Sequence, residues 1–217
     1  MFINWKLREI NLKIVYYGPA LSGKTANLQY IHAKTNPHLR GDLVSLKTRG
    51  DRTLYFDFLQ LELGQIAGLK PRFNLYTVPG QVYYTNSRRL VLQGADGVVF
   101  VADSQRRRLE ENVEAVRDME KNLHALGHDP HAIPLVLQCN KRDLPDIASV
   151  PFIRQQLSLN GAPCFESVAI QGSGVFDTLK AVINLVVSQA QQQIYPWAGT
   201  AGGYGPRHAK RAAIPFL

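Results

Sequence analysis

Cysteine is scarce in this chain of 217 residues, which has two, Cys139 and Cys164. So few thiols exclude a disulfide-stapled scaffold, and because both lie in apolar, strand-like runs we expect small buried thiols in a reducing compartment. The sequence also lacks an apolar run of membrane-spanning length, and residues 1–10 lack the apolar stretch of a signal peptide. We therefore predict no transmembrane segment and a cytoplasmic protein that can become peripheral or polar through its partners.

Internal repeats and coiled-coil heptads are absent, and acidic residues are in the minority. The 17 Asp and Glu against 25 Lys and Arg give a formal net charge of +8. This excess permits binding to nucleic acid, an anionic membrane surface or an acidic partner, but does not choose among them. The basic runs at residues 106–108 and 207–211 are interpreted as a solvated face, and no specific nucleic-acid binding is expected.

Strand-like apolar runs alternate with segments of helical periodicity along most of the chain. This alternation predicts an α/β fold with a central, mostly parallel sheet flanked by helices on both faces. In such sheets, ligands bind beyond the carboxyl ends of the strands. We expect one domain at residues 1–193 and a basic tail of Gly, Pro and aromatic residues at 194–217. The predicted strands are residues 12–17, 54–63, 73–78, 97–102, 134–139 and 164–169, and the predicted helices are residues 24–34, 86–93, 110–126 and 176–192.

A phosphate-binding motif, G-x-x-x-x-G-K-T, follows the first of these predicted strands and opens the first predicted helix. The backbone N–H groups of such a loop surround phosphate oxygens, and the helix N-terminus adds partial positive charge. Lys24 is expected to reach the β- and γ-phosphates and the Thr25 hydroxyl to bind Mg²⁺. The candidate residues are Gly18, Ala20, Leu21, Ser22, Gly23, Lys24, Thr25 and Ala26.

A base-reading motif, Asn140-Lys141-Arg142-Asp143, follows a later predicted strand and matches N-K-x-D. The Asp143 carboxylate can accept hydrogen bonds from N1–H and the amino group of guanine, whereas adenine offers no such donor pair. We therefore predict GTP and GDP as ligands. Asn140 is expected to tie loops together and the Lys141 stem to cover one face of the base.

Two further segments are expected to complete the base-reading end of the sheet. Val168, Ala169 and Ile170, after the last predicted strand, are predicted to supply a backbone N–H to the guanine carbonyl. Asp103, at the end of another predicted strand, is interpreted as structural rather than ligating.

A γ-phosphate sensor is predicted at Thr77-Val78-Pro79-Gly80-Gln81, which corresponds to the D-x-x-G-Q element of Ras-like proteins with threonine in place of the aspartate. The Gly80 N–H would contact the γ-phosphate and Gln81 would orient the attacking water. Two roles remain, a second protein ligand for the metal and a cation for the γ-phosphate. In the loop after the first helix, chemistry alone leaves two candidates for each. These are Thr48 and Thr53 for the metal, and Arg49 and Arg52 for the γ-phosphate.

Together these motifs resemble the MglA-like bacterial small GTPases, whose fold is the Ras-like G domain of P-loop NTPases. The resemblance rests on T-V-P-G-Q, on residues 14–19 and 21–25, on residues 52–54 with 56–59, and on residues 140–145. It implies that Thr53 binds Mg²⁺, that Arg52 is an arginine finger catalytic alongside Gln81, and that Asp57 acts behind the metal. It also implies a dimeric Roadblock-fold activating partner and a role in polarity or motility machinery.

One position departs from that family, because MglA-like proteins usually carry glycine where this chain has Ala20. A methyl group there crowds Gln81 and Arg52, so slow hydrolysis is expected. The favoured function is a regulatory GTPase that cycles between GDP and GTP with Mg²⁺ and binds partners through its switch segments. The alternatives are a GTP-locked or barely hydrolysing scaffold and, disfavoured by N-K-R-D, a metabolic P-loop kinase.

Overall fold

An eight-stranded mixed sheet forms the centre of the computed structural model, which describes residues 1–47, 55–80, 85–159 and 161–194. The strand order is β3-β4-β5-β2-β6-β7-β8, with β1 paired to β2. The pairs from β5 through β2, β6 and β7 to β8 are parallel, and β1–β2, β3–β4 and β4–β5 are antiparallel. The strands are β1 Phe2–Asn4, β2 Glu9–Tyr17, β3 Val44–Lys47, β4 Tyr55–Glu62, β5 Lys70–Thr77, β6 Gly97–Asp103, β7 Leu135–Asn140 and β8 Cys164–Glu166.

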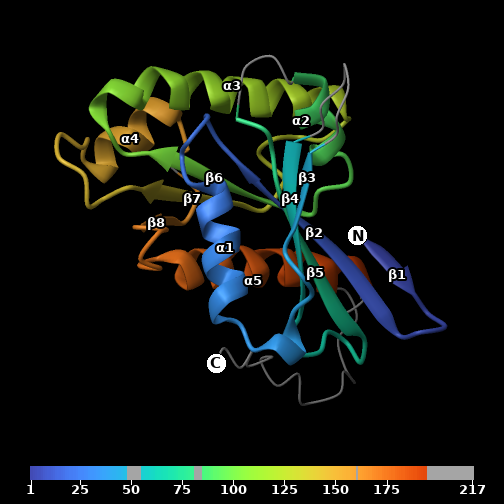
Figure 1. Ribbon diagram of the computed structural model, residues 1–217. Helices are drawn as coiled ribbons and strands as arrows, with labels where there is room; N and C mark the ends of the chain where they lie inside the picture. Colours follow the sequence, from blue (N-terminus) through green and yellow to red (C-terminus); the bar gives the residue numbers. More distant parts are fainter. Residues whose placement is uncertain (48–54, 81–84, 160, 195–217) are drawn as a thin grey trace, which may run out of the picture.

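Helices cover both faces of the sheet, with α1 and α5 on one face and α2, α3 and α4 on the other (Figure 1). Side chains alternate along a strand, so β2 sends Ile14 and Tyr16 into the first core and Val15 and Tyr17 into the second. All of β6 is buried, as expected of a parallel strand covered on both sides. The helices are α1 Lys24–Lys34, α2 Thr85–Leu92, α3 Leu109–Ala125, α4 Val150–Leu157 and α5 Val175–Ile194, with 3-10 turns at Pro37–Leu39 and Arg106–Arg108.

A buried polar group interrupts the first core where α1 and α5 meet β7. Gln138 on β7 exchanges two hydrogen bonds with the Asn27 side chain, at 2.8 and 3.0 Å, and donates a third to Thr178 Oγ1 at 3.0 Å. All three residues are fully buried. Each amide therefore has partners that water cannot replace.

The α/β architecture predicted from the sequence is confirmed, and the differences lie in short elements. The strands β1 and β3 and the helix α4 were not predicted, because three to eight residues carry too little periodicity. The last strand, β8, ends at Glu166 rather than residue 169, since the chain turns back at residues 168–172, where Val168 O accepts from the N–H groups of Gln171 and Gly172. Cys164 on this edge strand is half-buried rather than buried, while Cys139 is buried and both thiols are free.

The tail predicted at residues 194–217 lies outside the described residues beyond Ile194, where α5 ends. Within the described part of the chain, no helix combines the length and the apolar character needed to cross a lipid bilayer.

Candidate functional site

The loop at residues 18–25 connects the carboxyl end of β2 to the first turn of α1. Gly23 has φ +105, and a Cβ added there would lie 2.1 Å from Asn140 Nδ2, so the position requires glycine. Ser22 is buried, and its hydroxyl has no hydrogen-bond partner among the described residues. Gly18 and Lys24 are buried as well, Ala20 and Ala26 are half-buried, and Leu21 and Thr25 are exposed. A loop of this shape at a helix N-terminus is suited to an anion.

Lys24 is the cation of this loop, with 7% of its surface exposed. Its Nζ donates to the carbonyl oxygens of Gly18 and Pro19, at 2.9 and 2.6 Å. The pKa of Lys24 is lowered to about 7, mainly by burial and also by the charge of Arg88, while Asp57 acts in the opposite direction. Among the described residues, this buried ammonium group contacts neutral carbonyls and no counter-charge, and a phosphate group would supply one.

An oxygen-rich cluster lies beside Thr25, centred on the buried carboxylate of Asp57 on β4. The Thr25 hydroxyl donates to Asp57 Oδ2 at 2.6 Å, and Ser45 Oγ donates to Oδ1 at 2.6 Å. Thr77 Oγ1 accepts from the Asp57 N–H at 2.8 Å and donates to Oδ2 at 3.0 Å. Hydroxyl and carboxylate oxygens are the donor atoms that Mg²⁺ prefers, so the cluster fits that ion. The carboxylate comes from β4, while the neighbouring strand β5 supplies Thr77.

Asn140, at the end of β7, joins three segments that are distant in the sequence. Its Nδ2 donates to Ser22 O at 2.7 Å. Its Oδ1 accepts from Ser167 Oγ at 3.0 Å and from the Ala169 N–H at 2.9 Å. The phosphate-type loop and the segment after β8 are thereby held in one fixed arrangement.

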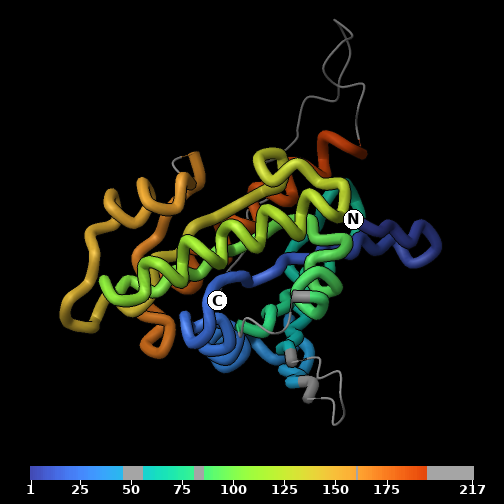
Figure 2. The backbone as a smooth tube through the Cα atoms, turned by 90° about the horizontal axis from the view of Figure 1, so that it is seen from above, coloured from blue at the N-terminus to red at the C-terminus, as the bar shows by residue number. Residues whose placement is uncertain are grey.

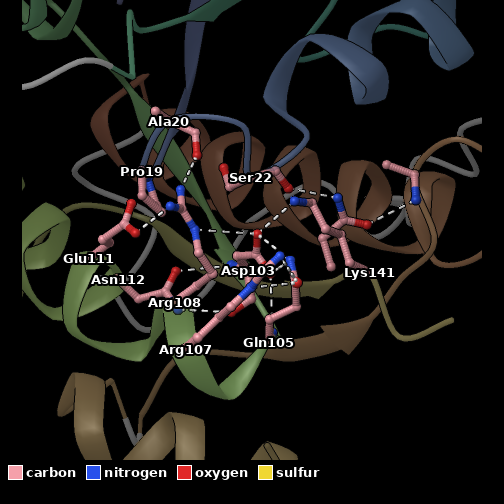
Figure 3. Close-up of polar contacts among 12 residues, drawn as sticks. Pro19, Ala20, Ser22, Asp103, Gln105, Arg107, Arg108, Glu111, Asn112 and Lys141 are labelled. Atoms are coloured by element: carbon pink, nitrogen blue, oxygen red, sulfur yellow. Dashed lines mark hydrogen bonds and ion pairs between the residues drawn. The ribbon is translucent and has the colours of Figure 1, made fainter. Parts of the chain in front are cut away.

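Asp103 is the centre of a buried ionic network next to Asn140, and Figure 3 shows it between Lys141, Gln105 and Arg108. Lys141 has φ +65 and its Nζ donates to Asp103 Oδ2 at 2.6 Å. Arg108 lies 3.9 Å from the same oxygen and donates from its other end to Ala20 O at 2.8 Å. Asp103 therefore orients the side chains of two cations, one beside the base-reading loop and one over the phosphate-type loop.

Asp143 is exposed, and its carboxylate makes no hydrogen bond with the described residues. In the nearby turn the Val168 N–H donates to Ser173 O at 3.1 Å and the Ala169 N–H to Asn140. Ile170 is 75% exposed, and its N–H has no partner within the described chain. Of the three predicted donors, Ile170 is therefore the one whose N–H is open to a ligand.

Gly80 lies directly against the phosphate-type loop. A Cβ added to Gly80 would lie 2.4 Å from Ala20 Cα and 3.1 Å from Lys24 Nζ, so this contact requires glycine. Arg88 on α2 holds the segment, since its Nε donates to Pro79 O at 3.0 Å and its Nη2 to Gly80 O at 3.4 Å.

On its other side, Arg88 Nη1 forms an ion pair with Asp118 of α3 at 2.7 Å. The same carboxylate also accepts from Tyr17 OH, at the end of β2. Burial is the largest cause of the raised pKa of the Tyr17 hydroxyl, and the Asp118 carboxylate raises it further. The segment before Gln81 is thus fixed to α3 and to β2.

The predicted switch residues Arg52, Thr53 and Gln81 lie outside the described residues, as do their competitors Thr48 and Arg49. Three described residues were not predicted for the site, namely Ser45, Arg88 and Arg108. Arg108 stood in a basic run interpreted as solvated, yet it is half-buried and contacts Ala20. Its spacing from Asp103, which ends a strand, and from Glu111 was the available signal.

A loop of this form after the first parallel strand, joined through Asn140 to an N-K-x-D loop two strands along the sheet, defines the Ras-like G domain of small GTPases. The family model described as the ADP-ribosylation factor family matches residues 1–186, and the chain belongs to this family. The expected P-loop NTPase fold and the expected class of GTP-binding protein are confirmed.

Two curated proteins show how this chain is placed within the class. It is 56% identical over 191 residues to the mutual gliding-motility protein MglA of Myxococcus xanthus (strain DK1622), covering 88% of this chain and 98% of that protein. It is 27% identical over 168 residues to ADP-ribosylation factor-like protein 4D of Mus musculus, covering 77% and 76% of the two chains. The resemblance to MglA-like small GTPases is confirmed.

Proposed function

We propose that this protein is a regulatory GTPase that cycles between GDP- and GTP-bound states with Mg²⁺ and controls polarity or motility machinery through its switch segments. The observation that carries the proposal is the position of Asn140, which bonds both Ser22 and Ala169 and so couples phosphate binding to base reading. The 56% identity to a protein named for gliding motility supports the cellular role.

Guanine selection rests on two groups that are open in this site. Asp143 would accept from N1–H and the amino group, and the Ile170 N–H would donate to the guanine carbonyl. The stem of Lys141 would lie along the base, with its ammonium group held by Asp103 at 2.6 Å. Adenine reverses the donors and acceptors at these positions, so ATP would leave Asp143 facing an acceptor.

Phosphate and metal binding would fall to Lys24, Thr25 and Asp57. Lys24 would exchange carbonyl partners for phosphate oxygens, and Thr25 would turn its hydroxyl from Asp57 toward the metal. Mg²⁺ supplies charge neutralisation between the β- and γ-phosphates when it is bound. Asp57 would then accept hydrogen bonds from the water ligands of the metal, with Thr53 as a further protein ligand.

Hydrolysis would depend on Gln81 orienting the water and on Arg52 stabilising transition-state charge, with Gly80 contacting the γ-phosphate. We infer slow turnover by the protein alone and stimulation by a dimeric Roadblock-fold activator. Chromatography of the nucleotide released on denaturation tests the core of the proposal, which fails if an adenine nucleotide is recovered or if ATP competes with GDP as well as GTP does.

A GTP-locked scaffold is the second candidate, and the contact between Gly80 and Ala20 favours it. A Cβ on Gly80 would be 2.4 Å from Ala20 Cα, so the backbones of Gly80 and Ala20 lie in direct contact at the place proposed for the γ-phosphate. Single-turnover hydrolysis by the parent and by Ala20→Gly, with and without a Roadblock-type activator, separates the two candidates. A faster variant with equal GTP affinity supports restraint by the methyl group, and equal rates in both conditions exclude it.

A further inference from the structure

The first two strands form a hairpin that projects from the body of the molecule, away from the helices (Figures 1 and 2). Residues 5–8 make its turn, in which Asn4 Oδ1 accepts from the Leu7 N–H at 3.2 Å and Trp5 O accepts from the Arg8 N–H at 3.4 Å. The tip is therefore a formed turn that presents its side chains outward.

Large apolar side chains are concentrated on this hairpin. Trp5 is 69% exposed, Phe2 64% and Leu7 57%. Single exposed apolar residues are ordinary, but three within six consecutive residues form a local apolar surface with a cost in water. Burial of this surface would offset that cost.

The same tip is basic. Lys6 and Arg8 alternate with Trp5 and Leu7, both are exposed, and residues 1–8 contain no acidic side chain. The exposed Lys70 adjoins them, because its N–H donates to Arg8 O at 2.7 Å. The nearest carboxylate in the sequence, that of Glu9, is paired with Arg72 at 2.8 Å.

We propose that this hairpin tip docks on an anionic phospholipid bilayer, with Trp5 and Leu7 entering the headgroup region and Lys6 and Arg8 at the lipid phosphates. Tryptophan beside basic residues suits the interface between water and lipid. A projecting tip enters a fluid interface directly, whereas a protein partner would need a pocket of matching shape. The net charge of +8 attracts the whole molecule to the same surface.

The hairpin is far from the nucleotide-binding end. It precedes the first residue of β2, Glu9, whereas the phosphate-type loop follows the last, Tyr17. Nine residues of strand span roughly 30 Å. Membrane docking therefore leaves the phosphate-type loop at the end of the sheet away from the lipid, and we expect docking to be independent of the bound nucleotide.

Sedimentation of the full chain with sucrose-loaded vesicles tests this inference, in GDP and in a non-hydrolysable GTP analogue. Vesicles of phosphatidylcholine alone are compared with vesicles of phosphatidylcholine and phosphatidylglycerol. We expect binding to the anionic vesicles only, equal in both nucleotides and weaker with added salt. In a Trp197→Phe background Trp5 is the remaining tryptophan of the two, and its emission should shift to the blue on binding.

Matched variants test whether the hairpin tip is the surface that binds the vesicles. Lys6→Gln with Arg8→Gln should lower partitioning by about 25-fold, at about fivefold per charge. The control Arg117→Gln with Lys121→Gln removes the same charge from exposed positions on α3 and should lower it far less. Trp5→Ala and Leu7→Ala should each weaken binding, whereas Phe152→Ala, at an exposed apolar residue of α4, should not.

Three results would overturn the inference. The first is equal binding to neutral and anionic vesicles, and the second is equal loss in the hairpin and control variants. The third is self-association in ultracentrifugation that Leu7→Ala abolishes while vesicle binding stays absent, which would make the tip an interface between copies of this chain. GDP affinity measured on each variant keeps this outcome separate from the proposed GTPase function.

Discussion

Asp143 carries the discrimination between purine bases in the proposed site, because its exposed carboxylate has no partner among the described residues. Asp143→Asn replaces an acceptor by a donor, so affinity should shift from guanine toward xanthine nucleotides. The shift should be at least about tenfold, which corresponds to one or two hydrogen bonds to a charged group. Competition against fluorescent GDP with GTP, XTP and ATP measures this shift. Asp146→Asn, in the same loop and paired with Arg106, is the control that should change nothing.

Lys24 gives the site a pH dependence whose sign follows from its lowered pKa of about 7. Above that pH the Lys24 side chain of the nucleotide-free protein is mostly neutral, and a bound phosphate group favours its charged form. Nucleotide binding should therefore take up a proton, and affinity should fall as the pH rises above about 7. Calorimetry near pH 8 in buffers of different ionisation enthalpy detects the uptake.

The control for this prediction is Lys24→Met, which should bind weakly and take up no proton. Stability of the nucleotide-free protein changes in the opposite sense to affinity. The unfolded chain holds the lysine proton up to about 10.5, so stability should increase as the pH rises from about 7 toward that value. Proton release on binding, or stability that falls over this range, would contradict the assignment.

Among elements, α2 and α3 control the position of Gly80 through Arg88. Arg88→Ala would leave Asp118 without its cation and free the carbonyls of Pro79 and Gly80, so urea unfolding should show a loss of about 2 kcal/mol. Single-turnover hydrolysis should fall more than GDP affinity, because Gly80 is proposed to contact only the γ-phosphate. Arg89→Ala, which removes a hydrogen bond from Arg89 Nε to Asn122 Oδ1 at 3.4 Å, should have a smaller effect on both. Unchanged hydrolysis in Arg88→Ala would show that the ion pair is structural alone.

The long elements could be predicted from the sequence, as could the positions of α2 and β8, whereas β1, β3 and α4 could not. The helix at residues 24–34 agrees with α1 because a glycine-rich loop and Thr35 bound it on either side. The strand β3 could not be predicted, since its four residues are stabilised by pairing to β4 rather than by their own pattern. For the same reason Ser45 was missed, as its contact with Asp57 depends on that pairing.

The residues proposed to bind the phosphates and the base could be singled out in the sequence, because that chemistry fixes both residue type and local spacing. Arg88 and Arg108 were not, because each acts on backbone carbonyls that come near only in the folded chain. Thr77 also illustrates that contacts made only in the folded chain cannot be predicted from the sequence. The missing aspartate could be seen in the sequence, and the resemblance indicated Asp57 behind the metal, but the contact between Asp57 and Thr25 is made only in the folded chain.

For the whole molecule, nucleotide binding and folding should be coupled, since Asn140 joins segments of three distant regions. GDP at 100 times its dissociation constant should add about 2.7 kcal/mol to the free energy of unfolding. Chelation of Mg²⁺ should reduce this gain, and ADP should not produce it. Thermal unfolding at several ligand concentrations measures the effect, and equal shifts with ADP and GDP would contradict it.

The hydrogen-bonded group of Gln138, Asn27 and Thr178 has a consequence for how α1 and α5 are aligned. Apolar contacts alone would let the two helices slide along the sheet at little cost, whereas two amides facing each other at 2.8 and 3.0 Å match in one alignment. A change of Asn27 and Gln138 together to leucine would keep both helices buried. The variant would then pack in several alignments of similar energy instead of one. Broadened side-chain resonances at these helices would reveal exchange between the alignments.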